Sequence, residues 1–566
     1  MSTRRALIAL LLSGCCALQV VWVANAAAPA APAGRAAIAS AHPEATGAGL
    51  EVLRAGGNAF DAAVAVAAAL GVVDPGGSGL SGGGFFLLHR ASDGRDILID
   101  AREVAPRAAT RDMYLDAAGN PVPRLSVDSA LGAGIPGEPA GMAMLSARYG
   151  RMSAAQSLAP AIRLARKGFA LTPRLRQELA GGKLRRFAST PDIARNFLRR
   201  GEVPELGAII RQPELADTLE LLAKSSFDAF YHGDLARRMV SGVRALGGIW
   251  TEQDLAEYRA VEREPIVGQY RGARIVSAPP PSSGGIGLVE GLNILSNFEL
   301  DKVDSLTRKH LIIEAERRLH RDRAIYLGDP DFISMPVQRL TSPDYAAGLA
   351  AAIHTAHALP SASLPGLGAG ASQGPQTTHF SVVDGEGNRV AATLTLNFTF
   401  GSGLMIAGTG MFLNDEMDDF SMKPGVPNGY GLVGAEANAI APGKRMLSSM
   451  TPTFIETPDR IMVVGSPGGS YIIGMVLLAT LDFMDGRNAT QIVGAPRIHH
   501  QYLPDVVQAE PGALTEAERA GLKAMGHTLQ EGNRRWGNLQ VVIQDRTSGA
   551  IDAAADPRGD GQARVQ

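Results

Sequence analysis

The sequence is poor in cysteine, since among 566 residues only Cys15 and Cys16 are of this type, and both lie close to the N-terminus. If that segment is removed, neither a disulfide nor cysteine catalysis is available, even in an oxidising compartment. The chain also lacks a charge bias, with 54 Lys and Arg residues against 56 Asp and Glu residues, and no basic run is interleaved with aromatics. We therefore expect no nucleic-acid partner.

Several catalytic signatures are missing as well. There is no H-E-x-x-H motif and no phosphate-binding loop, and adjacent His499 and His500 would point to opposite sides of a strand. The sequence thus predicts neither a metal nor a nucleotide cofactor. Residues 79–83 match G-x-S-x-G, but that nucleophile elbow requires a helix directly after it, and "GFFLLHR" is typical of a strand. We expect Ser81 not to be a nucleophile.

The N-terminus has the form of an export signal. "MSTRR" is basic, "ALIALLLSGCCALQVVWV" is apolar, and Ala24, Asn25 and Ala26 form an A-x-A cleavage site. We predict a signal peptide over residues 1–26 and a periplasmic or secreted protein that begins at Ala27. Alternatively, "LSGC" resembles a lipobox, in which case Cys15 would be lipidated and the protein anchored to a membrane.

The rest of the chain has the composition of a globular protein, with 45% hydrophobic residues. Only the segment near 355–376 has a linker-like composition, so we expect one large folded body. Residues 51–73 predict an alanine-rich buried helix interrupted by glycines, and residues 82–90 a short buried strand. Residues 304–330 predict a helix whose basic side chains cover a solvated face.

A β-hairpin follows the linker-like segment. "TTHFSVV", the turn "DGEGN" and "RVAATLTLNFTF" show the alternation and the glycine-rich turn of two paired strands. In the second strand, a period of two places polar side chains on one face and large apolar ones on the other: Thr393, Thr395, Asn397 and Thr399 against Leu394, Leu396, Phe398 and Phe400. Alone, the polar row is more typical of a solvated sheet surface.

Motifs along the chain change that interpretation. They include "GGNAFDAAVA", "DAREVAPRAATRDMY", "GIPGEPAG", "YRGARIVSAPPPSSGG", "YLGDPDF", "TTHFSVVD", "LNDEMDDFS", "PGVPNGYGLVG", "LSSMTPT", "GSPGGS" and "ADPR". In this order, from about residue 36 to 558, they closely resemble the γ-glutamyltransferase family of N-terminal nucleophile hydrolases. Two departures are small: Ser81 stands where the family commonly has glycine, and "RRWGNLQ" differs from the usual segment, which leaves the role of Asn538 open.

The resemblance implies cleavage of the chain between Gln376 and Thr377. A threonine hydroxyl is a poor nucleophile without an adjacent base, and no Ser-His-Asp arrangement is evident. Cleavage would give Thr377 a free α-amino group with a reference pKa of about 7.7–8.0, which can act as a base near neutral pH. Cutting the chain therefore creates the catalytic base, with residues 27–376 as a large subunit and 377–566 as a small one.

The resemblance also implies the substrate pocket. Arg102, Ser448 and Ser449 would bind the α-carboxylate of a γ-glutamyl group, and Asn397, Glu416 and Asp419 its α-ammonium. The planar guanidinium of arginine suits bidentate binding of a carboxylate. The N–H groups of Gly468 and Gly469 would stabilise the oxyanion, and Thr395 would orient Thr377. We interpret His379 as structural, because it lies about 7 Å along the strand from Thr377.

The loop at residues 424–435, "PGVPNGYGLVGA", has two prolines at its start and four glycines, with Tyr430 in its pliable part. Composition alone slightly favours a surface connection with a packed tyrosine. The resemblance favours a lid over the γ-glutamyl pocket instead, because some family members carry one.

From the resemblance we expect an α+β protein built as a four-layer αββα sandwich, autoprocessed into a heterodimer of its own two fragments. The expected activity is transfer of the γ-glutamyl group of glutathione or related amides to water, amino acids or peptides, without a cofactor. A cephalosporin (glutaryl) acylase is the alternative within the superfamily, although it would have no ammonium for Glu416 and Asp419 to bind. An unprocessed, exported binding protein is the alternative from another class.

Overall fold

The structure, a computed structural model, describes residues 36–364 and 377–566, which all belong to one compact unit. The expected signal peptide, Cys15, Cys16 and Gln376 lie outside the described residues. Within these residues, no helix combines the length and the apolar composition needed to cross a bilayer.

The larger sheet is antiparallel throughout and holds the predicted hairpin at its centre. Its order is β20 (Gln562–Val565), β1 (Ala37–Ser40), β9 (Thr378–Val383), β10 (Arg389–Thr395), β2 (Gly83–Arg90), β3 (Arg95–Ala101) and β6 (Val261–Arg263). The two ends of the described chain meet at its edge, where Ala36 and Gln566 exchange backbone hydrogen bonds of 3.2 and 2.8 Å. Segments distant in sequence thus form one sheet.

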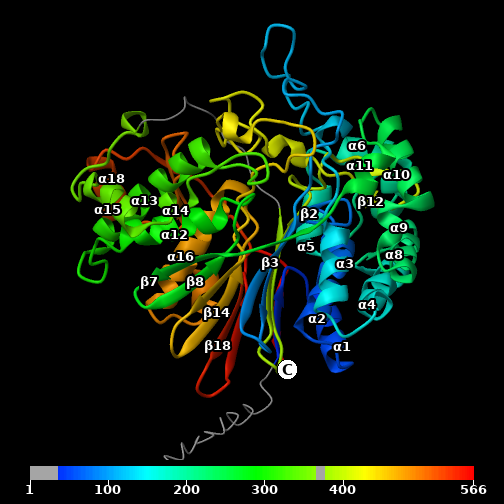
Figure 1. Cartoon of the computed structure of the whole chain (residues 1–566), viewed down its shortest axis with the longest axis horizontal. Coiled ribbons are helices and arrows are strands. Elements are labelled where there is room, and N and C mark those ends of the chain that lie inside the picture. Colours follow the sequence, from blue (N-terminus) through cyan, green and yellow to red (C-terminus); the bar gives the residue numbers. More distant parts are fainter. Residues whose placement is uncertain (1–35, 365–376) are drawn as a thin grey trace, which may run out of the picture. The chain divides into compact units, whose positions relative to one another are not determined.

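A second antiparallel sheet has the order β19 (Ile551–Ala555), β18 (Gln540–Asp545), β14 (Arg460–Gly465), β13 (Thr453–Glu456), β8 (Ala273–Ser277) and β7 (Ile266–Tyr270). Strand β14 contacts β9 and β10, and β18 contacts β9, so the two sheets pack face to face, as Figure 1 shows.

Helices cover the outer face of each sheet (Figure 1). On the larger sheet lie α1 (Pro43–Arg54), α2 (Ala59–Val73) and α3 (Glu138–Arg148), with α4 (Ala154–Lys167) and α8 (Pro213–Ser225) packed further out. On the second sheet lie α12 (Gly284–Leu295) and α16 (Ile472–Met484), with α13 (Ser305–Tyr326) and α15 (Pro343–Ala351) beyond. The α+β class predicted from the sequence is confirmed.

Strand β2 shows why a strand between two layers is apolar on both faces. Phe86 and Leu88 belong to the core under the helices of the larger sheet, whereas Phe85 and Leu87 belong to the core shared with the second sheet. Because successive side chains of a strand point to opposite faces, both faces of β2 are buried. The predicted buried strand at 82–90 is therefore confirmed.

The helix predicted over residues 51–73 is two helices. Helix α1 ends at Arg54, Gly56 has φ +95°, and Asn58 caps α2 through a capping box with Asp61. The glycines that interrupted the pattern mark this junction, because a left-handed residue ends a helix.

The helix predicted over 304–330 is α13, but its charged residues do not cover a solvated face. Arg317 and Arg318 are buried, and both guanidinium groups pair with the buried Glu314. The prediction was wrong because buried charges are tolerated when carboxylates and hydrogen-bond acceptors compensate them.

The hairpin of β9 and β10 is confirmed, but β10 ends at Thr395, five residues earlier than the alternation predicts. Asn397 has φ +76° and Phe400 has φ +59°, so the chain turns away from the sheet at this point. The polar face of β10 is buried between the sheets, where Thr393 bonds His379 at 2.8 Å. A solvated sheet surface is thereby ruled out for this row.

Shorter elements complete the structure. The helices are α5 (Pro173–Leu179), α6 (Leu184–Ser189), α7 (Pro191–Phe197), α9 (Asp228–Tyr231), α10 (Gly233–Ala245), α11 (Glu252–Glu257), α14 (Val337–Leu340), α17 (Ala489–Gly494) and α18 (Glu516–Ala524). The strands are β4 (Phe169–Ala170), β5 (Ile209–Ile210), β11 (Met405–Ile406), β12 (Met411–Phe412), β15 (Ile498–His499), β16 (Val507–Ala509) and β17 (Leu529–Glu531). The 3-10 turns are η1 (Ala130–Gly132), η2 (Ser361–Ser363), η3 (Glu416–Asp419), η4 (Glu436–Asn438) and η5 (Gly469–Tyr471).

Candidate active site

Thr377 lies immediately before β9, an inner strand of the larger sheet that β1 and β10 flank. Its side chain is almost completely buried, and its Oγ1 lies 3.4 Å from Oγ1 of Thr395 on β10. The backbone N–H of Asn397 donates to Oγ1 of Thr395 at 2.8 Å. The hydroxyl of Thr395 is thus held between the backbone and Thr377, which fits the expected orienting role.

The glycines that follow Ser81 have a packing explanation. A Cβ on Gly82 would lie 2.0 Å from the carbonyl oxygen of Thr395, and one on Gly84 would lie 2.2 Å from that of Thr393. Only glycine allows β2 to approach β10 this closely. Ser81 donates its hydroxyl to the carbonyl oxygen of Phe412. The strand β2 follows directly, so the conformation required of a nucleophile elbow is absent here.

Ten of the eleven predicted site residues line one small cavity of about 20 Å³. These are Arg102, Thr377, Thr395, Asn397, Glu416, Asp419, Tyr430, Ser448, Ser449 and Gly469, and Leu432, Met450 and Ile472 complete the wall. A volume of this size holds about one water molecule. The side chains that line the cavity therefore contact one another and leave little space between them.

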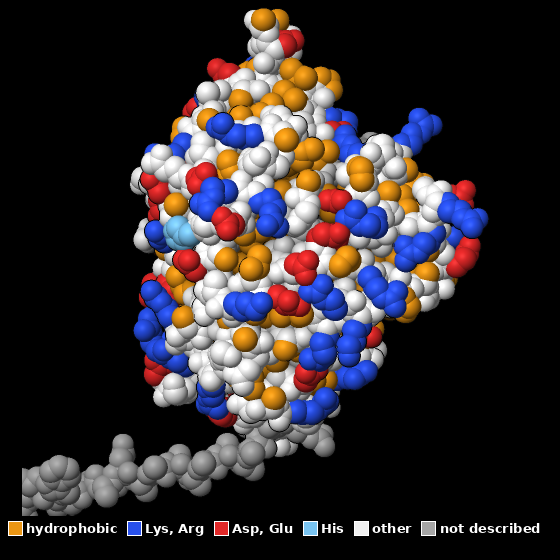
Figure 2. Space-filling view, turned by 90° about the vertical axis from the view of Figure 1, so that its right-hand side faces the viewer, with side chains coloured by type: hydrophobic (Ala, Val, Ile, Leu, Met, Phe, Trp, Pro, Cys, Tyr) orange, Lys and Arg blue, Asp and Glu red, His pale blue; other side chains and the backbone are white. Residues whose placement is uncertain are grey.

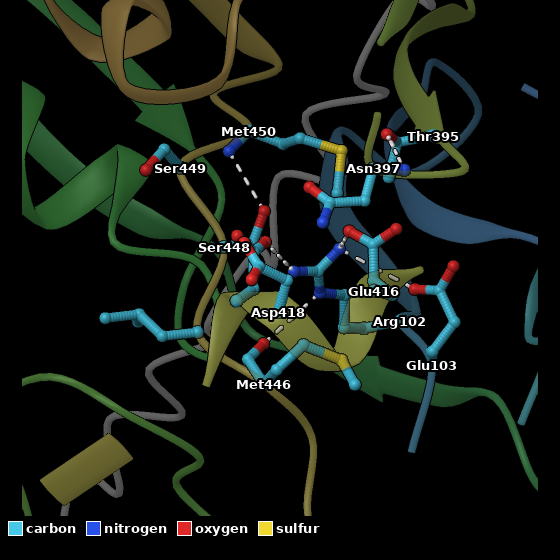
Figure 3. A network of polar contacts seen from close by, with 12 residues as sticks. Arg102, Glu103, Thr395, Asn397, Glu416, Asp418, Met446, Ser448, Ser449 and Met450 are labelled. Atoms are coloured by element: carbon cyan, nitrogen blue, oxygen red, sulfur yellow. Dashed lines mark hydrogen bonds and ion pairs between the residues drawn. The ribbon is translucent and has the colours of Figure 1, made fainter. Parts of the chain in front are cut away.

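Arg102 lies at the centre of the polar network in Figure 3. Its fully buried guanidinium forms ion pairs with Glu416 and Asp419, and its Nε donates to the carbonyl oxygen of Met446 at 3.2 Å. Burial alone would lower the pKa of Arg102, but Glu416, Asp419 and Glu103 raise it above its ordinary value. The group is thus a permanent cation.

Opposing effects act on the pKa of the Glu416 carboxyl. Burial raises its pKa to about 7, although the Arg102 cation lowers it, and neighbouring Asp419 raises it further. Burial also raises the pKa of Asp419. The two carboxyls therefore take up protons at a higher pH than exposed ones do.

The serine pair is positioned by hydrogen bonds that leave hydroxyl protons available. Ser448 Oγ accepts the backbone N–H of Met450 at 3.1 Å, so its own proton is free to donate. Ser449 Oγ accepts Nε of Arg323 at 3.1 Å, and the same Nε lies 3.0 Å from Oγ of Ser283. Sequence reasoning missed Arg323, which is buried on α13, because it assigned the charges of that helix to solvent.

Gly468 and Gly469 form the turn between β14 and the start of η5 and α16. Gly468 has φ +151° and Gly469 φ +55°, and a Cβ on Gly468 would lie 2.4 Å from Cε of Met475. The turn therefore requires glycine at both positions. Gly469 lines the small cavity, whereas Gly468 lines a larger neighbouring one. The N–H groups at the start of a helix attract anions.

The loop at 424–435 closes the cavity through Tyr430. The tyrosine is buried, its hydroxyl donates to the carbonyl oxygen of Asn397 at 2.7 Å, and its ring stacks on Phe398 with the centroids 4.4 Å apart. Asn397 in turn donates from Nδ2 to the carbonyl oxygen of Asp415 at 2.9 Å. The tyrosine is packed, and it also forms part of the cavity wall.

Two further residues from the sequence analysis, His379 and Asn538, lie outside the small cavity. His379 contacts Thr393 and Ser381 between the sheets, and burial lowers its pKa to about 3, so it stays neutral. Asn538 is buried, and its backbone N–H donates to Ser466 Oγ at 3.2 Å, two residues before Gly468. Asn538 therefore contacts the segment that leads into the glycine turn.

A cluster of His310, Glu314 and His527 places three ligand-type groups within 4.8 Å of one another, and sequence reasoning did not find it. His310 Nδ1 and His527 Nε2 lie 2.8 Å apart, and Glu314 forms ion pairs with Arg317 and Arg318. Because these donor atoms bind one another and two cations, we interpret the cluster as a structural network.

Comparisons with a family model and with curated proteins agree with each other. A family model described as gamma-glutamyltranspeptidase matches residues 45–566. The chain is 42% identical over 573 residues to the glutathione hydrolase proenzyme of Escherichia coli (strain K12), covering 98% of this chain and 97% of that protein. It is also 42% identical over 534 residues to the glutathione hydrolase proenzyme of Pseudomonas sp. (strain A14), covering 92% and 90%.

Among solved structures, a cephalosporin acylase from Bacillus halodurans matches with a TM-score of 0.81 and 29% identity, covering 94% of this chain and 96% of that chain. The family model spans almost all of the described residues, including every residue of the small cavity. The chain therefore belongs to the gamma-glutamyltranspeptidase family.

Proposed function

We propose that this protein is a glutathione hydrolase and γ-glutamyltransferase that cuts itself between Gln376 and Thr377 and then uses Thr377 as its nucleophile. The observation that carries this proposal is the small cavity, in which the Thr377 hydroxyl shares a wall with Arg102 and two carboxyls. The 42% identity to a glutathione hydrolase proenzyme over nearly the whole chain supports it.

The proposed chemistry is acyl transfer. The Thr377 oxygen bonds to the γ-carbonyl carbon of the substrate while the α-amine of Thr377 takes the hydroxyl proton. The carbon–nitrogen bond then breaks, and the leaving amine takes that proton. Water or an amino-acid amine attacks the resulting ester and releases Thr377. The N–H groups of Gly468 and Gly469 would stabilise the oxyanion, and loss of one such donor costs roughly 10² to 10³ in rate.

The pocket would recognise both charges of a γ-glutamyl group. Arg102, together with the Ser448 and Ser449 hydroxyls, would bind the α-carboxylate, while Glu416, Asp419 and Asn397 would bind the α-ammonium. Without substrate, Arg102 pairs with Glu416 and Asp419 directly, which keeps the buried charges compensated. A bound zwitterion would insert between them and give each group a new partner. The cavity of about 20 Å³ must widen for this, so we propose that the Tyr430 loop moves as a lid.

We further propose the processing and location that the sequence predicted. The two face-to-face sheets and their outer helices would form the four-layer αββα sandwich of the N-terminal nucleophile hydrolases. Residues 27–376 and 377–566 would be the large and small subunits of a heterodimer. Residues 1–26 would direct export to the periplasm or beyond, unless Cys15 is lipidated and anchors the protein to the membrane.

A cephalosporin (glutaryl) acylase is the second candidate, favoured by the 0.81 TM-score to such an enzyme. A glutaryl group has no α-ammonium, so it would leave the buried carboxyls of Glu416 and Asp419 without a cationic substrate group to bind. Kinetic comparison of a γ-glutamyl anilide with its glutaryl analogue separates the two. Preference for the glutaryl compound would favour the acylase.

The proposed function is tested with purified protein on a denaturing gel and by N-terminal sequencing. We expect two fragments, with the smaller one of 566 − 376 = 190 residues beginning Thr-Thr-His-Phe. Thr377→Ala should stay as one chain and release no product from glutathione. A single wild-type chain without hydrolase activity would favour the exported binding protein, and a processed, active Thr377→Ala protein would refute the mechanism.

A further inference from the structure

A second, much larger cavity of about 1030 Å³ adjoins the small one. The two meet at two places along the chain: Asn397 lines the small cavity and Phe398 the large one, while Gly469 lines the small cavity and Gly468 the large one. Phe398 also stacks on Tyr430 of the small cavity. A substrate held at Thr377 by its γ-glutamyl end would therefore extend its other end into the larger cavity.

The larger cavity is strongly cationic. Among the described residues that line it, eight are arginine or lysine, whereas only Asp128 and Glu178 are acidic. In contrast, Figure 2 shows basic and acidic side chains interspersed over the face that it draws. The charge of the cavity is therefore a local feature and does not follow from the net charge of the chain, which is −2.

Part of this charge is already compensated. Arg124 pairs with Asp128 and Arg174 with Glu178, and Arg558 pairs with two carboxylates behind the wall. These contacts neutralise three of the cations, but the cavity wall keeps an excess of positive over negative charge.

Two further cations are held by backbone oxygens. Lys183 donates to the carbonyl oxygen of Thr399 at 2.8 Å, and Arg186 donates to that of Asp128 at 3.1 Å. Both also contact the turn that follows β10, at Gly401 and Ser402. They therefore fix the wall next to Phe398, and no carboxylate within the cavity pairs with them.

Three arginines remain available, from two segments of the chain that both line the cavity. Arg185 comes from α6, whereas Arg534 and Arg535 come from the loop that precedes β18. All three side chains are exposed, and within residues 36–364 and 377–566 none has an ion pair or a hydrogen bond. A ligand in the cavity would thus meet guanidinium groups from both segments.

We propose that this cavity binds the part of the substrate beyond the scissile amide, and that it selects peptides carrying two or more carboxylates. The inference rests on the proposed γ-glutamyl transfer at Thr377 and adds the class of leaving group and acceptor. Arginine suits this task because its planar, permanently charged guanidinium binds carboxylates bidentately. The volume lies at the upper end of ligand sites, which is enough for several residues of an extended peptide.

The test compares two isosteric substrates, γ-Glu-Asp-Asp-amide and γ-Glu-Asn-Asn-amide, which differ only in two negative charges. We expect kcat/KM for the acidic peptide to be about tenfold higher at low ionic strength, since cationic clefts raise association rates by 10-fold or more. The preference should largely disappear in 0.5 M NaCl, because salt screens exposed charges. Equal values at low salt would overturn the inference.

Paired variants locate the effect. Arg534→Ser/Arg535→Ser should reduce the acidic-to-neutral ratio from about tenfold to about twofold, because rim charges act on association. Arg185→Ser, on α6, should reduce the same ratio independently. The matched control is Arg237→Ser/Arg238→Ser, an exposed arginine pair on α10 that does not line the cavity, and its ratio should equal that of the wild type. A ratio that falls equally in the control, or in neither cavity variant, would overturn the inference.

The two proposals fail differently. Lack of hydrolysis of a γ-glutamyl anilide by the wild type would refute the proposed function, because the anilide needs only Thr377 and the small cavity. Normal anilide hydrolysis without a charge preference among the peptides would leave the function standing and refute the cationic cavity as a binding site.

Discussion

At the scale of the residue, Arg102 illustrates how shape and charge can be separated. Arg102→Lys keeps the positive charge but loses the planar fork, so the substrate carboxylate loses at least one charge-assisted hydrogen bond, worth about 1.5–3 kcal/mol. We expect KM for a γ-glutamyl anilide to rise roughly tenfold or more, while self-cleavage proceeds as in the wild type. Steady-state kinetics and a denaturing gel measure the two effects. Equal loss of both would mean that Arg102 maintains the fold and does not bind substrate.

Glu416 gives a prediction on pH. Because burial raises its pKa to about 7, the carboxyl is protonated below that pH and cannot attract the substrate ammonium. KM for the anilide should therefore fall as the pH rises from 6 to 8. In Glu416→Gln this pH dependence of KM should be largely lost, and variant and wild type should converge below pH 6. Because the α-amine of Thr377 acts mainly through kcat, a parallel KM profile in the variant would contradict the assignment.

Single residues were predicted unevenly from the sequence. The resemblance named ten residues that lie around one cavity, although their roles stay predictions. It missed that Arg102 pairs with Glu416 and Asp419 when no substrate is present, because a sequence does not show how buried charges are compensated. Arg323 was missed for a related reason, since a charged residue on a helix is most often exposed.

At the scale of the element, the loop at 424–435 has the most direct consequence. Tyr430 holds it closed through Asn397 and Phe398. Replacing residues 426–433 by a Gly-Ser link should leave self-cleavage intact, admit larger γ-glutamyl amides, and change the ratio of hydrolysis to transfer. The measurement compares glutathione with a bulky polymeric γ-glutamyl substrate. A matched control shortens the turn at residues 116–120, where Leu115 and Pro121 pair. Unchanged rates in the first variant would show that the loop is no lid.

Elements were predicted correctly where the hydrophobic pattern of the sequence alone determines them. Their ends were predicted wrongly where tertiary contacts turn the backbone. The strand at 82–90 was placed within one residue, because both of its faces are apolar. The second strand of the hairpin was extended too far, because alternation continues in the sequence after Asn397 has turned to φ +76°. A positive φ at a non-glycine residue is set by the contacts around it, here those of Tyr430 and Asp415.

At the scale of the whole molecule, each sheet mixes strands from both proposed subunits. Strand β1 of the large subunit lies between β20 and β9 of the small one, and β8 pairs with β13 across the same division. The cleaved fragments should therefore elute together in gel filtration and unfold in a single cooperative transition. Elution of a free 377–566 fragment without denaturant would contradict this. Thr377→Ala serves as the uncut reference.

The arrangement of the whole molecule depended on the resemblance. Local patterns indicated strands and helices, but the order of strands in a sheet comes from pairings between distant segments, such as β1 with β20. The alternation of polar and apolar residues in a strand does not show which other strand it pairs with. The two-sheet core therefore could not be predicted from the residues alone.

The hydrogen-bonded pairing of Ala36 with Gln566 brings these two residues side by side. A short linker between these residues, together with new ends at 376 and 377, gives a circular permutant whose translated chain begins at Thr377 once the initiator methionine is removed. Such a protein needs no self-cleavage, because its nucleophile already carries a free α-amine. Its rate of glutathione hydrolysis should not depend on maturation time, whereas that of the natural order should rise as the precursor is cut. In the natural chain order, the protein would thus fold first and become active only after cleavage, whereas in the permuted order folding alone would give an active enzyme.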